Sequence, residues 1–252
     1  MNKPLLCPVC NAACALLDVV DFNKSCEEAK GKFLAVVGVP VYYSLCSNCG
    51  FCFVPEMAAW KLEDFEEMVY NDEYVLVDPD YIEIRPKANA ANLISMFGEK
   101  AHSIRHLDYG GGGGLLSSIL NESRWQSVSY DPFVDRSVNI DQLGKFDLIT
   151  AFEVFEHVPD INQLMSTLRS LLAPDGIVLF STLLSDGNIH ARQRITWWYA
   201  SPRNGHISLF SKRSLAILAR NSEFKFGSFS AGFHTFFKRI PSWADQVLRV
   251  GQ

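Results

Sequence analysis

The sequence predicts an α/β protein with a doubly wound, seven-stranded and mostly parallel sheet, preceded by a small metal-binding module. Three observations carry this prediction. Apolar strands alternate with helical patterns through the second half of the chain, which is typical of a parallel sheet covered on both faces. Five consecutive glycines, 110–114, follow one of these strands, and two Cys-x-x-Cys pairs precede them.

The composition restricts the class of protein and its partners. Hydrophobic residues make up 48% of the 252 residues, which is ample for a buried core. A formal net charge of -5 argues against nucleic-acid binding and against an anionic membrane surface. No apolar run approaches the ~18 residues of a membrane span, and the N-terminal segment has no signal-peptide pattern. We therefore expect a cytoplasmic protein without a membrane or nucleic-acid partner.

The two cysteine pairs, Cys7 with Cys10 and Cys46 with Cys49, have the spacing of metal knuckles. Each pair lets two thiolates meet one metal ion, and four thiolates form the tetrahedral set that structural zinc prefers. We predict a structural Zn²⁺ ion and a zinc-binding module over residues 1–55. The alternatives are that all seven cysteines are core thiols, or that one pair is redox-active.

Residues 56–100 are predicted to form a helical linker or lid. The stretch 60–74 is acidic and amphipathic, with apolar residues at helical spacing. A second helix is expected over 86–97, with Pro86 in its first turn. Such a helix would lead into the first strand of the following domain.

The remaining residues, 101–252, are predicted to form the α/β domain. The expected strands are 103–109, 125–133, the very short 138–141, one within 145–160, 176–184 and a closing pair within 224–240. The expected helices are 115–121, 161–176 and 211–224, the last capped by Ser211. A long segment, 185–210, precedes the last helix at the carboxyl edge of the sheet, and loops of this length are usually functional.

The glycine run lies between two acidic strand ends, Asp108 and Asp131. Only glycine lets a backbone turn this tightly and lie flat against a ligand. A carboxylate at the end of the second strand can accept hydrogen bonds from both ribose hydroxyls of a bound nucleoside. A nicotinamide dinucleotide would favour Gly-x-Gly-x-x-Gly, but the third glycine position is Leu115 or Ser117. The spacing therefore disfavours a nicotinamide-dependent oxidoreductase.

The spacing that fits is an acid two residues before alternating glycines, followed by a helix. Together with FDLITAFEVFEHVPD (146–160) and LLAPDGIVLF (171–180), it resembles the motifs of class I S-adenosylmethionine-dependent methyltransferases over about residues 100–240. The resemblance implies a Rossmann-like methyltransferase fold and S-adenosylmethionine as cofactor, with Asp108 supporting its amino-acid part and Asp131 its ribose. The candidate cofactor-binding residues are Asp108, Tyr109, Gly110, Gly112, Gly114, Asp131, Pro132, Phe152 and Glu153.

The segment 185–210 holds the candidate catalytic residues, His206 and Tyr199. His206 is a candidate general base because imidazole takes up a proton near neutral pH. The alternative is a histidine that packs against the sheet and bonds to the backbone. Tyr199 and the two tryptophans before it either stack on a flat or sugar-like acceptor or pack the core of the segment. Arg192, Arg194 and Arg203 either bind an anionic group such as phosphate or belong to a solvated basic loop.

A second resemblance concerns the cysteine knuckles and the same segment. PVYYSLCSNCGFCFVPEM (40–57) resembles the second knuckle of zinc-binding methyltransferases that act on nucleotide-linked deoxysugars. Those enzymes carry Tyr-His-Glu-His and then Tyr-Phe-Ser after the fifth strand, where this chain has GHISLFS (205–211). His206 matches the final histidine, whereas Gly205 replaces the glutamate. Loss of that acid disfavours sugar C-methylation, while transfer to oxygen or nitrogen needs a single base.

These resemblances imply a methyltransferase whose acceptor is a small molecule or a carbohydrate, with a nucleotide sugar as one candidate. A non-enzymatic hypothesis stands beside it, in which the chain is a zinc-containing adaptor with a vestigial cofactor site. Binding of S-adenosylhomocysteine separates the two hypotheses, because an adaptor should not bind it.

Overall fold

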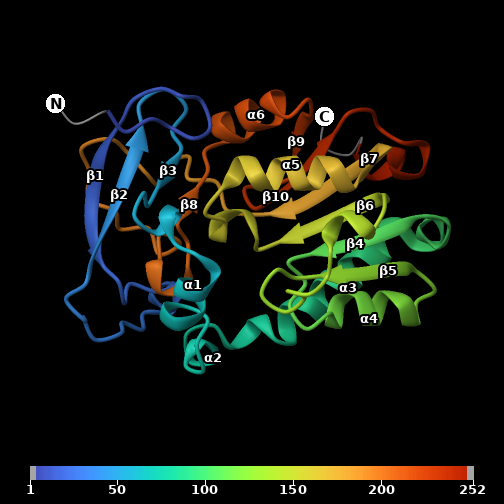
Figure 1. Ribbon diagram of the computed structural model, residues 1–252, viewed down its shortest axis with the longest axis horizontal. Helices are drawn as coiled ribbons and strands as arrows, with labels where there is room; N and C mark the ends of the chain where they lie inside the picture. The colour runs from blue at the N-terminus through green and yellow to red at the C-terminus, as the bar shows by residue number, and fades with distance from the viewer. Residues whose placement is uncertain (1–3, 249–252) are drawn as a thin grey trace. The chain divides into compact units, whose positions relative to one another are not determined.

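The computed structural model describes residues 4–248, which form two compact units (Figure 1). The first unit contains the residues up to Pro79 together with Glu156–Asn162 and Leu183–Leu218. The second contains Asp80–Phe155, Gln163–Thr182 and the residues from Ala219 on. The N-terminal cysteines and the predicted catalytic segment thus fall in one unit, and the glycine turn falls in the other. The domain boundaries at residues 55 and 100 stay predictions.

The second unit is built on a sheet that has six strands within the described part of the chain. In spatial order they are β5 (Gln126–Tyr130), β4 (Arg105–Tyr109), β6 (Phe146–Phe152), β7 (Leu172–Ser181), β10 (Phe233–Phe237) and β9 (Lys225–Ser228). The first four pair in parallel, and β10 is antiparallel to both of its neighbours. The predicted mostly parallel sheet with a closing hairpin is confirmed.

One of the seven predicted strands, the short one over 138–141, does not form. Residues there turn into a short 3-10 helix, η5 (Ile140–Gln142). The side chain of Asn139 accepts a hydrogen bond from the backbone N–H of Asp141 at 3.0 Å. An asparagine that satisfies a nearby backbone donor favours a turn over a strand, which explains why this short stretch does not join the sheet.

The strand order places a switch point between β4 and β6. The chain runs from β4 out to β5 and then returns to β6 on the other side of β4. Ligands of open α/β sheets bind beyond the carboxyl ends of the strands at such a point. The glycine turn follows β4 at this edge, and Glu153 follows β6.

Helices cover both faces of this sheet (Figure 1). α3 (Ile84–Phe97), α4 (Leu115–Glu122) and the short α7 (Asp245–Leu248) pack on one face, and α5 (Ile161–Leu171) lies on the other. Strand β7 is therefore buried on both sides, and Ile177, Val178, Leu179 and Phe180 have no exposed surface. This burial explains why residues 177–180 are all apolar and do not alternate with polar ones.

The first unit has a small antiparallel sheet of its own. Its strands are β1 (Cys14–Asp21), β2 (Pro40–Cys46), β3 (Cys52–Phe53) and β8 (Ser208–Leu209), in that spatial order. The helical segments are η1 (Cys26–Lys30), α1 (Leu62–Met68), α2 (Tyr74–Val77) and η7 (Pro202–Asn204). Because β8 pairs with β3, part of the predicted catalytic segment belongs to this sheet.

Most predicted helices form, with shifted ends. The amphipathic helix predicted over 60–74 ends at Met68, and the helix predicted over 161–176 ends at Leu171 because the next residues already belong to β7. α6 (Lys212–Asn221) follows Ser211, whose Oγ accepts a hydrogen bond from the N–H of Ser214 at 3.0 Å, so the predicted cap is confirmed. The remaining short 3-10 segments are η2 (Met57–Ala59), η3 (Pro79–Tyr81), η4 (Gly98–Ser103), η6 (Phe155–His157) and η8 (Ser242–Ala244).

Within residues 4–248, we find no helix with the length and apolar character needed to cross a bilayer. The cytoplasmic location stays a prediction.

Candidate functional site

One side of the glycine turn is too crowded for any side chain. Gly110 has a φ of 76°, and a Cβ on it would lie 2.5 Å from the side chain of Val154. A Cβ on Gly111 would overlap the carboxylate of Asp108. Glycine is therefore required here, both for the left-handed backbone at residue 110 and for the close approach at residue 111.

The other side of the turn is open and faces an acid. A Cβ on Gly112 or Gly113 would meet no atom within 4 Å. Asp131, just after β5, accepts hydrogen bonds from the N–H groups of Gly112 (2.9 Å) and Phe133 (2.8 Å). Each carboxylate oxygen has two acceptor positions. Asp131 can therefore hold the turn in place and still accept hydrogen bonds from a ligand.

Asp108 is the buried acid of this site, and its side chain is held from the neighbouring strand. The hydroxyl of Thr150 on β6 donates to its Oδ1 at 2.7 Å. Burial raises the pKa of Asp108, the Thr150 hydrogen bond lowers it and the negative charge of Asp131 raises it, with a net value of about 7. Near neutral pH, the groups around Asp108 therefore decide whether it is a carboxylate or a neutral acid.

The other predicted cofactor-binding residues lie at the same edge. Tyr109 ends β4 with its ring 5.7 Å from that of Tyr130, and Pro132 is half-buried in the turn after β5. Phe152 ends β6 and is half-buried. Glu153 follows it with a positive φ of 54°, and its carboxylate accepts a hydrogen bond from Ser181 at 2.9 Å. A glutamate held in the left-handed region is strained, and such strain concentrates at functional sites.

The four predicted metal ligands meet in the first unit. The Sγ atoms of Cys7 and Cys49 are 3.6 Å apart, those of Cys10 and Cys46 are 3.4 Å apart, and all four lie within 4.8 Å of one another. Four sulfurs at the 2.3 Å bond length of a tetrahedral zinc site would be about 3.8 Å apart. The hydrogen bond with the Cys49 thiol lowers the pKa of Cys7 to about 5, which favours the thiolate that a metal binds.

The two cysteine knuckles have the same backbone geometry. The N–H of Asn11 donates to the carbonyl of Cys7 at 2.9 Å, and the N–H of Gly50 donates to the carbonyl of Cys46 at 3.1 Å. Asn11 and Gly50 both have positive φ, at 60° and 74°. These turns direct both sulfurs of each pair to one point, and an asparagine tolerates the conformation nearly as well as glycine does. The fit to a tetrahedral metal ion therefore comes from both halves of the site.

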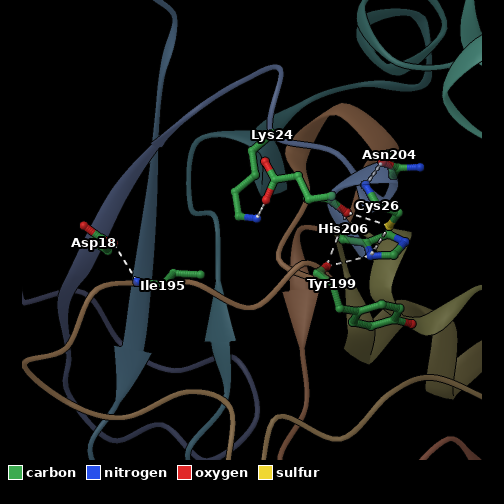
Figure 2. Close-up of polar contacts among 9 residues, drawn as sticks. Asp18, Lys24, Cys26, Ile195, Tyr199, Asn204 and His206 are labelled. Atoms are coloured by element: carbon green, nitrogen blue, oxygen red, sulfur yellow. Dashed lines mark hydrogen bonds and ion pairs between the residues drawn. The ribbon is translucent and has the colours of Figure 1, made fainter. Parts of the chain in front are cut away.

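His206, the predicted base, is 4% exposed and its ring is fixed by the backbone (Figure 2). Its Nδ1 lies 2.7 Å from the carbonyl oxygen of Tyr199, and the Cys26 Sγ lies 3.9 Å from the same nitrogen. A carbonyl oxygen only accepts, so Nδ1 carries the hydrogen and Nε2 carries the lone pair. This geometry is also that of the predicted alternative, a buried histidine bonded to the backbone. A hydrogen bond through Nδ1 does not prevent Nε2 from acting as a base.

Other residues gather around His206 that sequence reasoning did not select. The His157 ring lies 4.8 Å from that of His206, and the Tyr70 ring lies 6.2 Å from that of His157. Glu156 is fully buried and accepts a hydrogen bond from the hydroxyl of Tyr199. Glu156 and His157 lie within the fourth-strand motif over 146–160, so that motif is the signal that could have pointed to them.

Gly205 has no room for the glutamate that the sugar methyltransferases carry. Its φ is 81°, which is strained for any other residue. A Cβ there would lie 3.2 Å from both Nδ1 of His157 and the hydroxyl of Tyr70. The absence of the acid is therefore built into the turn before His206.

Two aromatic residues and two arginines of the segment have structural partners. Trp197 and Tyr199 are buried and their rings are 5.1 Å apart, which favours the predicted packing role for these two. Arg203 is buried and donates to the carbonyl of Val69 at 2.9 Å. Arg194 pairs with Asp18. A polar pocket of about 390 Å³ is lined by Gly187, Asn188, His190, Gln193, Arg194, Thr196, Trp197 and Trp198.

The sequence of the chain matches the family model described as "Methyltransferase domain" over residues 81–226. The ubiquinone biosynthesis O-methyltransferase of Bordetella avium is 30% identical over 103 residues, which cover 31% of this chain and 42% of that protein. The protein of the same name from Actinobacillus pleuropneumoniae is 31% identical over 132 residues, covering 41% and 51%. The chain thus spans about half the length of the curated relatives that it matches.

A solved structure with a similar chain trace is the 1,6-didemethyltoxoflavin-N1-methyltransferase of Burkholderia thailandensis with bound 1,6-didemethyltoxoflavin and S-adenosylhomocysteine. It is 18% identical, with a TM-score of 0.49, and the match covers 74% of this chain and 93% of that one.

Proposed function

Because the chain belongs to the methyltransferase-domain family, we propose that it transfers a methyl group from S-adenosylmethionine to an oxygen or nitrogen of a small molecule. The observation that carries the proposal is the glycine turn. It is packed on one side, open beside Gly112 and Gly113, and flanked by the acids Asp108 and Asp131. This combination suits a nucleoside that carries a positive charge, because the backbone can approach it and both acids can bind its polar ends.

The residues of the second unit fit the parts of this cofactor. Asp131 is placed to accept hydrogen bonds from ribose hydroxyls, as a carboxylate at the end of the second strand does. Asp108 offers a buried negative charge to the cationic amino-acid part. When bound, S-adenosylmethionine supplies an electrophilic methyl group on a sulfonium.

We propose His206 as the general base for the acceptor. An acceptor oxygen or nitrogen that takes the methyl group from the cofactor would have to release its own proton. Nε2 of His206 takes that proton, since Nδ1 already holds a hydrogen against the carbonyl of Tyr199. The buried carboxylate of Glu156, which has an oxygen within 4.8 Å of a ring nitrogen of His206, stabilises the resulting cation.

Oxygen or nitrogen is the acceptor atom that the site supports best. Gly205 stands where the sugar methyltransferases carry a glutamate next to the matching histidine, and sugar C-methylation would need stronger help to form a carbanion. The curated relatives are named O-methyltransferases. A nucleotide sugar stays a candidate acceptor, although Arg194 and Arg203 are already paired with protein groups.

We also propose that Cys7, Cys10, Cys46 and Cys49 hold one structural Zn²⁺ ion. The sulfur separations of 3.4 and 3.6 Å are close to those of a tetrahedral thiolate site. Four thiolates leave no open coordination position, so this metal would stabilise the fold and take no part in the reaction.

The reaction is tested by incubating the protein with methyl-labelled S-adenosylmethionine and separate pools of phenols, amines and nucleotide sugars. We expect label on an oxygen or nitrogen of one pool. Label on a sugar carbon would contradict the assigned acceptor atom. Failure to bind S-adenosylhomocysteine would instead support the adaptor hypothesis.

The Asp131→Ala variant should bind S-adenosylhomocysteine about 30-fold more weakly than the wild type, equivalent to ~2 kcal/mol, because hydrogen bonds to the ribose are lost. Equilibrium dialysis with labelled ligand measures the change. Asp175→Ala is the matched control, since Asp175 pairs with Arg239 on the surface of the same unit. Equal affinities of the two variants for S-adenosylhomocysteine would contradict a role of Asp131 in binding the cofactor.

A further inference from the structure

A chain of buried polar side chains ends at the carboxylate of Asp108. Ser117 on α4 and Ser127 on β5 have their hydroxyl oxygens 2.8 Å apart, and Ser127 Oγ lies 2.7 Å from Nδ1 of His106. On the other side of the ring, Nε2 lies 2.9 Å from Oγ1 of Thr150, which bonds Asp108. We name these five residues the relay. None of them serves the proposed reaction except Asp108.

The relay lies in the interior of the second unit, and only its two ends, Ser117 with Ser127 and Asp108, keep a small exposed surface. His106 and Thr150 have no exposed surface, and Asp108, Ser117 and Ser127 are also buried. The pairing of β4 with its two neighbouring strands brings the relay together. His106 lies opposite Ser127 of β5, and Asp108 lies opposite Thr150 of β6. Burial lowers the pKa of His106 to about 3, so the imidazole stays neutral and carries one hydrogen.

A neutral imidazole allows the hydrogen bonds of the relay to be arranged in two ways, with donors and acceptors exchanged along the chain of residues. We call these two arrangements the directions of the relay. With the hydrogen on Nε2, His106 donates to Thr150, and the Thr150 hydroxyl must then donate to Asp108, which is a carboxylate. With the hydrogen on Nδ1, Nε2 accepts from Thr150, and Asp108 must then be protonated to donate to Thr150 itself. Hydroxyl groups donate and accept equally well, so both directions satisfy every link.

We propose that His106 is a positioning residue for the cofactor: by its tautomer, and through Thr150, it sets whether Asp108 is a carboxylate or a neutral acid. This inference rests on the proposed function, in that the charge of Asp108 matters there for the cationic amino-acid part of the cofactor. The His106 ring touches no ligand and acts only through the relay.

The change of direction takes up one proton and moves four hydrogens by one link each. Solvent supplies a proton to Ser117, whose hydrogen passes to Ser127. The hydrogen of Ser127 passes to Nδ1 of His106. Nε2 gives its hydrogen to Thr150, and Thr150 gives its own to Asp108. The net result is a neutral Asp108 and an imidazole that has changed tautomer without becoming charged.

The charges around Asp108 place this change near neutral pH. Its titration is governed by burial, with the charge of Asp131 from the end of β5 adding to the shift and Thr150 of β6 opposing it. α4 contributes the uncharged Ser117, and the glycine turn contributes backbone only. With the pKa of Asp108 raised to about 7, the change of direction is expected within the pH range of the experiment below.

Nitrogen NMR of histidine-labelled wild-type protein without ligand tests the relay, because the two neutral tautomers have distinct ring-nitrogen shifts. We expect His106 to be neutral throughout, mainly Nε2–H at pH 8.5 and mainly Nδ1–H at pH 5.5. The Asp108→Asn variant, which cannot ionise, should hold one tautomer at both values. A wild-type tautomer that does not change with pH, or a charged His106, would overturn the proposal.

Ligand affinity gives a second readout. S-adenosylhomocysteine should bind about tenfold more weakly at pH 6 than at pH 8, since a proton must leave Asp108 before the cationic group binds. Thr150→Ser should keep the midpoint, and Thr150→Val should raise it because valine cannot donate to the carboxylate. Equal midpoints in these two variants would contradict the relay. If S-adenosylhomocysteine does not bind at all, the proposed function is contradicted. The NMR measurement of the His106 tautomer still tests the relay in that case, because it needs no ligand.

Discussion

The Cys46→Ser variant should lose bound zinc and much of the stability of the first unit. Structural zinc supplies about 10–16 kcal/mol of apparent binding energy in zinc-finger peptides. The first unit also has its own sheet, so we expect a smaller loss of at least ~5 kcal/mol and a fall in melting temperature of about 10–20 °C. Thermal unfolding followed by circular dichroism, together with metal analysis, measures both effects.

Cys14→Ser is the matched control for the zinc variant. Cys14 is half-buried in the same unit, starts β1 and lies outside the four-sulfur cluster. It should retain one zinc ion and melt near the wild type. Treatment of the wild type with a strong chelator should reproduce the Cys46→Ser result. A wild type that purifies without metal and melts like Cys46→Ser would contradict the zinc site.

The His206→Asn variant should lose about 10²–10⁴-fold in kcat, because a positioned general base contributes a factor of this size. The asparagine amide can still donate to the carbonyl of Tyr199, as Nδ1 does, so the fold of the segment should be retained. Affinity for S-adenosylhomocysteine should be unchanged, since the cofactor residues belong to the second unit. Steady-state kinetics with the acceptor identified by methyl uptake measures the loss.

His102→Asn is the control for the base variant. His102 lies in η4 and serves no step of the proposed reaction, so its kcat should match that of the wild type. If His206→Asn keeps more than a tenth of the wild-type kcat, His206 is a packing residue and the acceptor loses its proton to another group.

The parts of the structure that the sequence predicted well are local in the chain. The glycine turn, Asp108 and Asp131 lie within one strand-turn-helix-strand stretch, so their types and spacing predict their geometry. Each cysteine knuckle is likewise complete within a few residues, and only the meeting of the two knuckles depends on the fold. The short strand predicted over 138–141 failed because a side chain–backbone hydrogen bond at Asn139 outweighed the weak strand pattern.

The residues that the sequence did not reveal are brought together by tertiary structure. Tyr70 and His157 come from segments far from the predicted base His206 in the sequence, and no spacing rule connects them to it. The relay is a similar case, because His106 and Thr150 sit in strands that read as apolar. Their contact follows from the register between β4 and β6, which only the folded sheet defines.

The central claim is that the glycine turn between Asp108 and Asp131 holds S-adenosylmethionine. Titration calorimetry of the wild type at pH 8 with S-adenosylhomocysteine tests it most directly. The account predicts saturable binding of one ligand per chain and no heat with a reduced nicotinamide dinucleotide. A flat titration with S-adenosylhomocysteine, or saturable binding of the dinucleotide in its place, would contradict it.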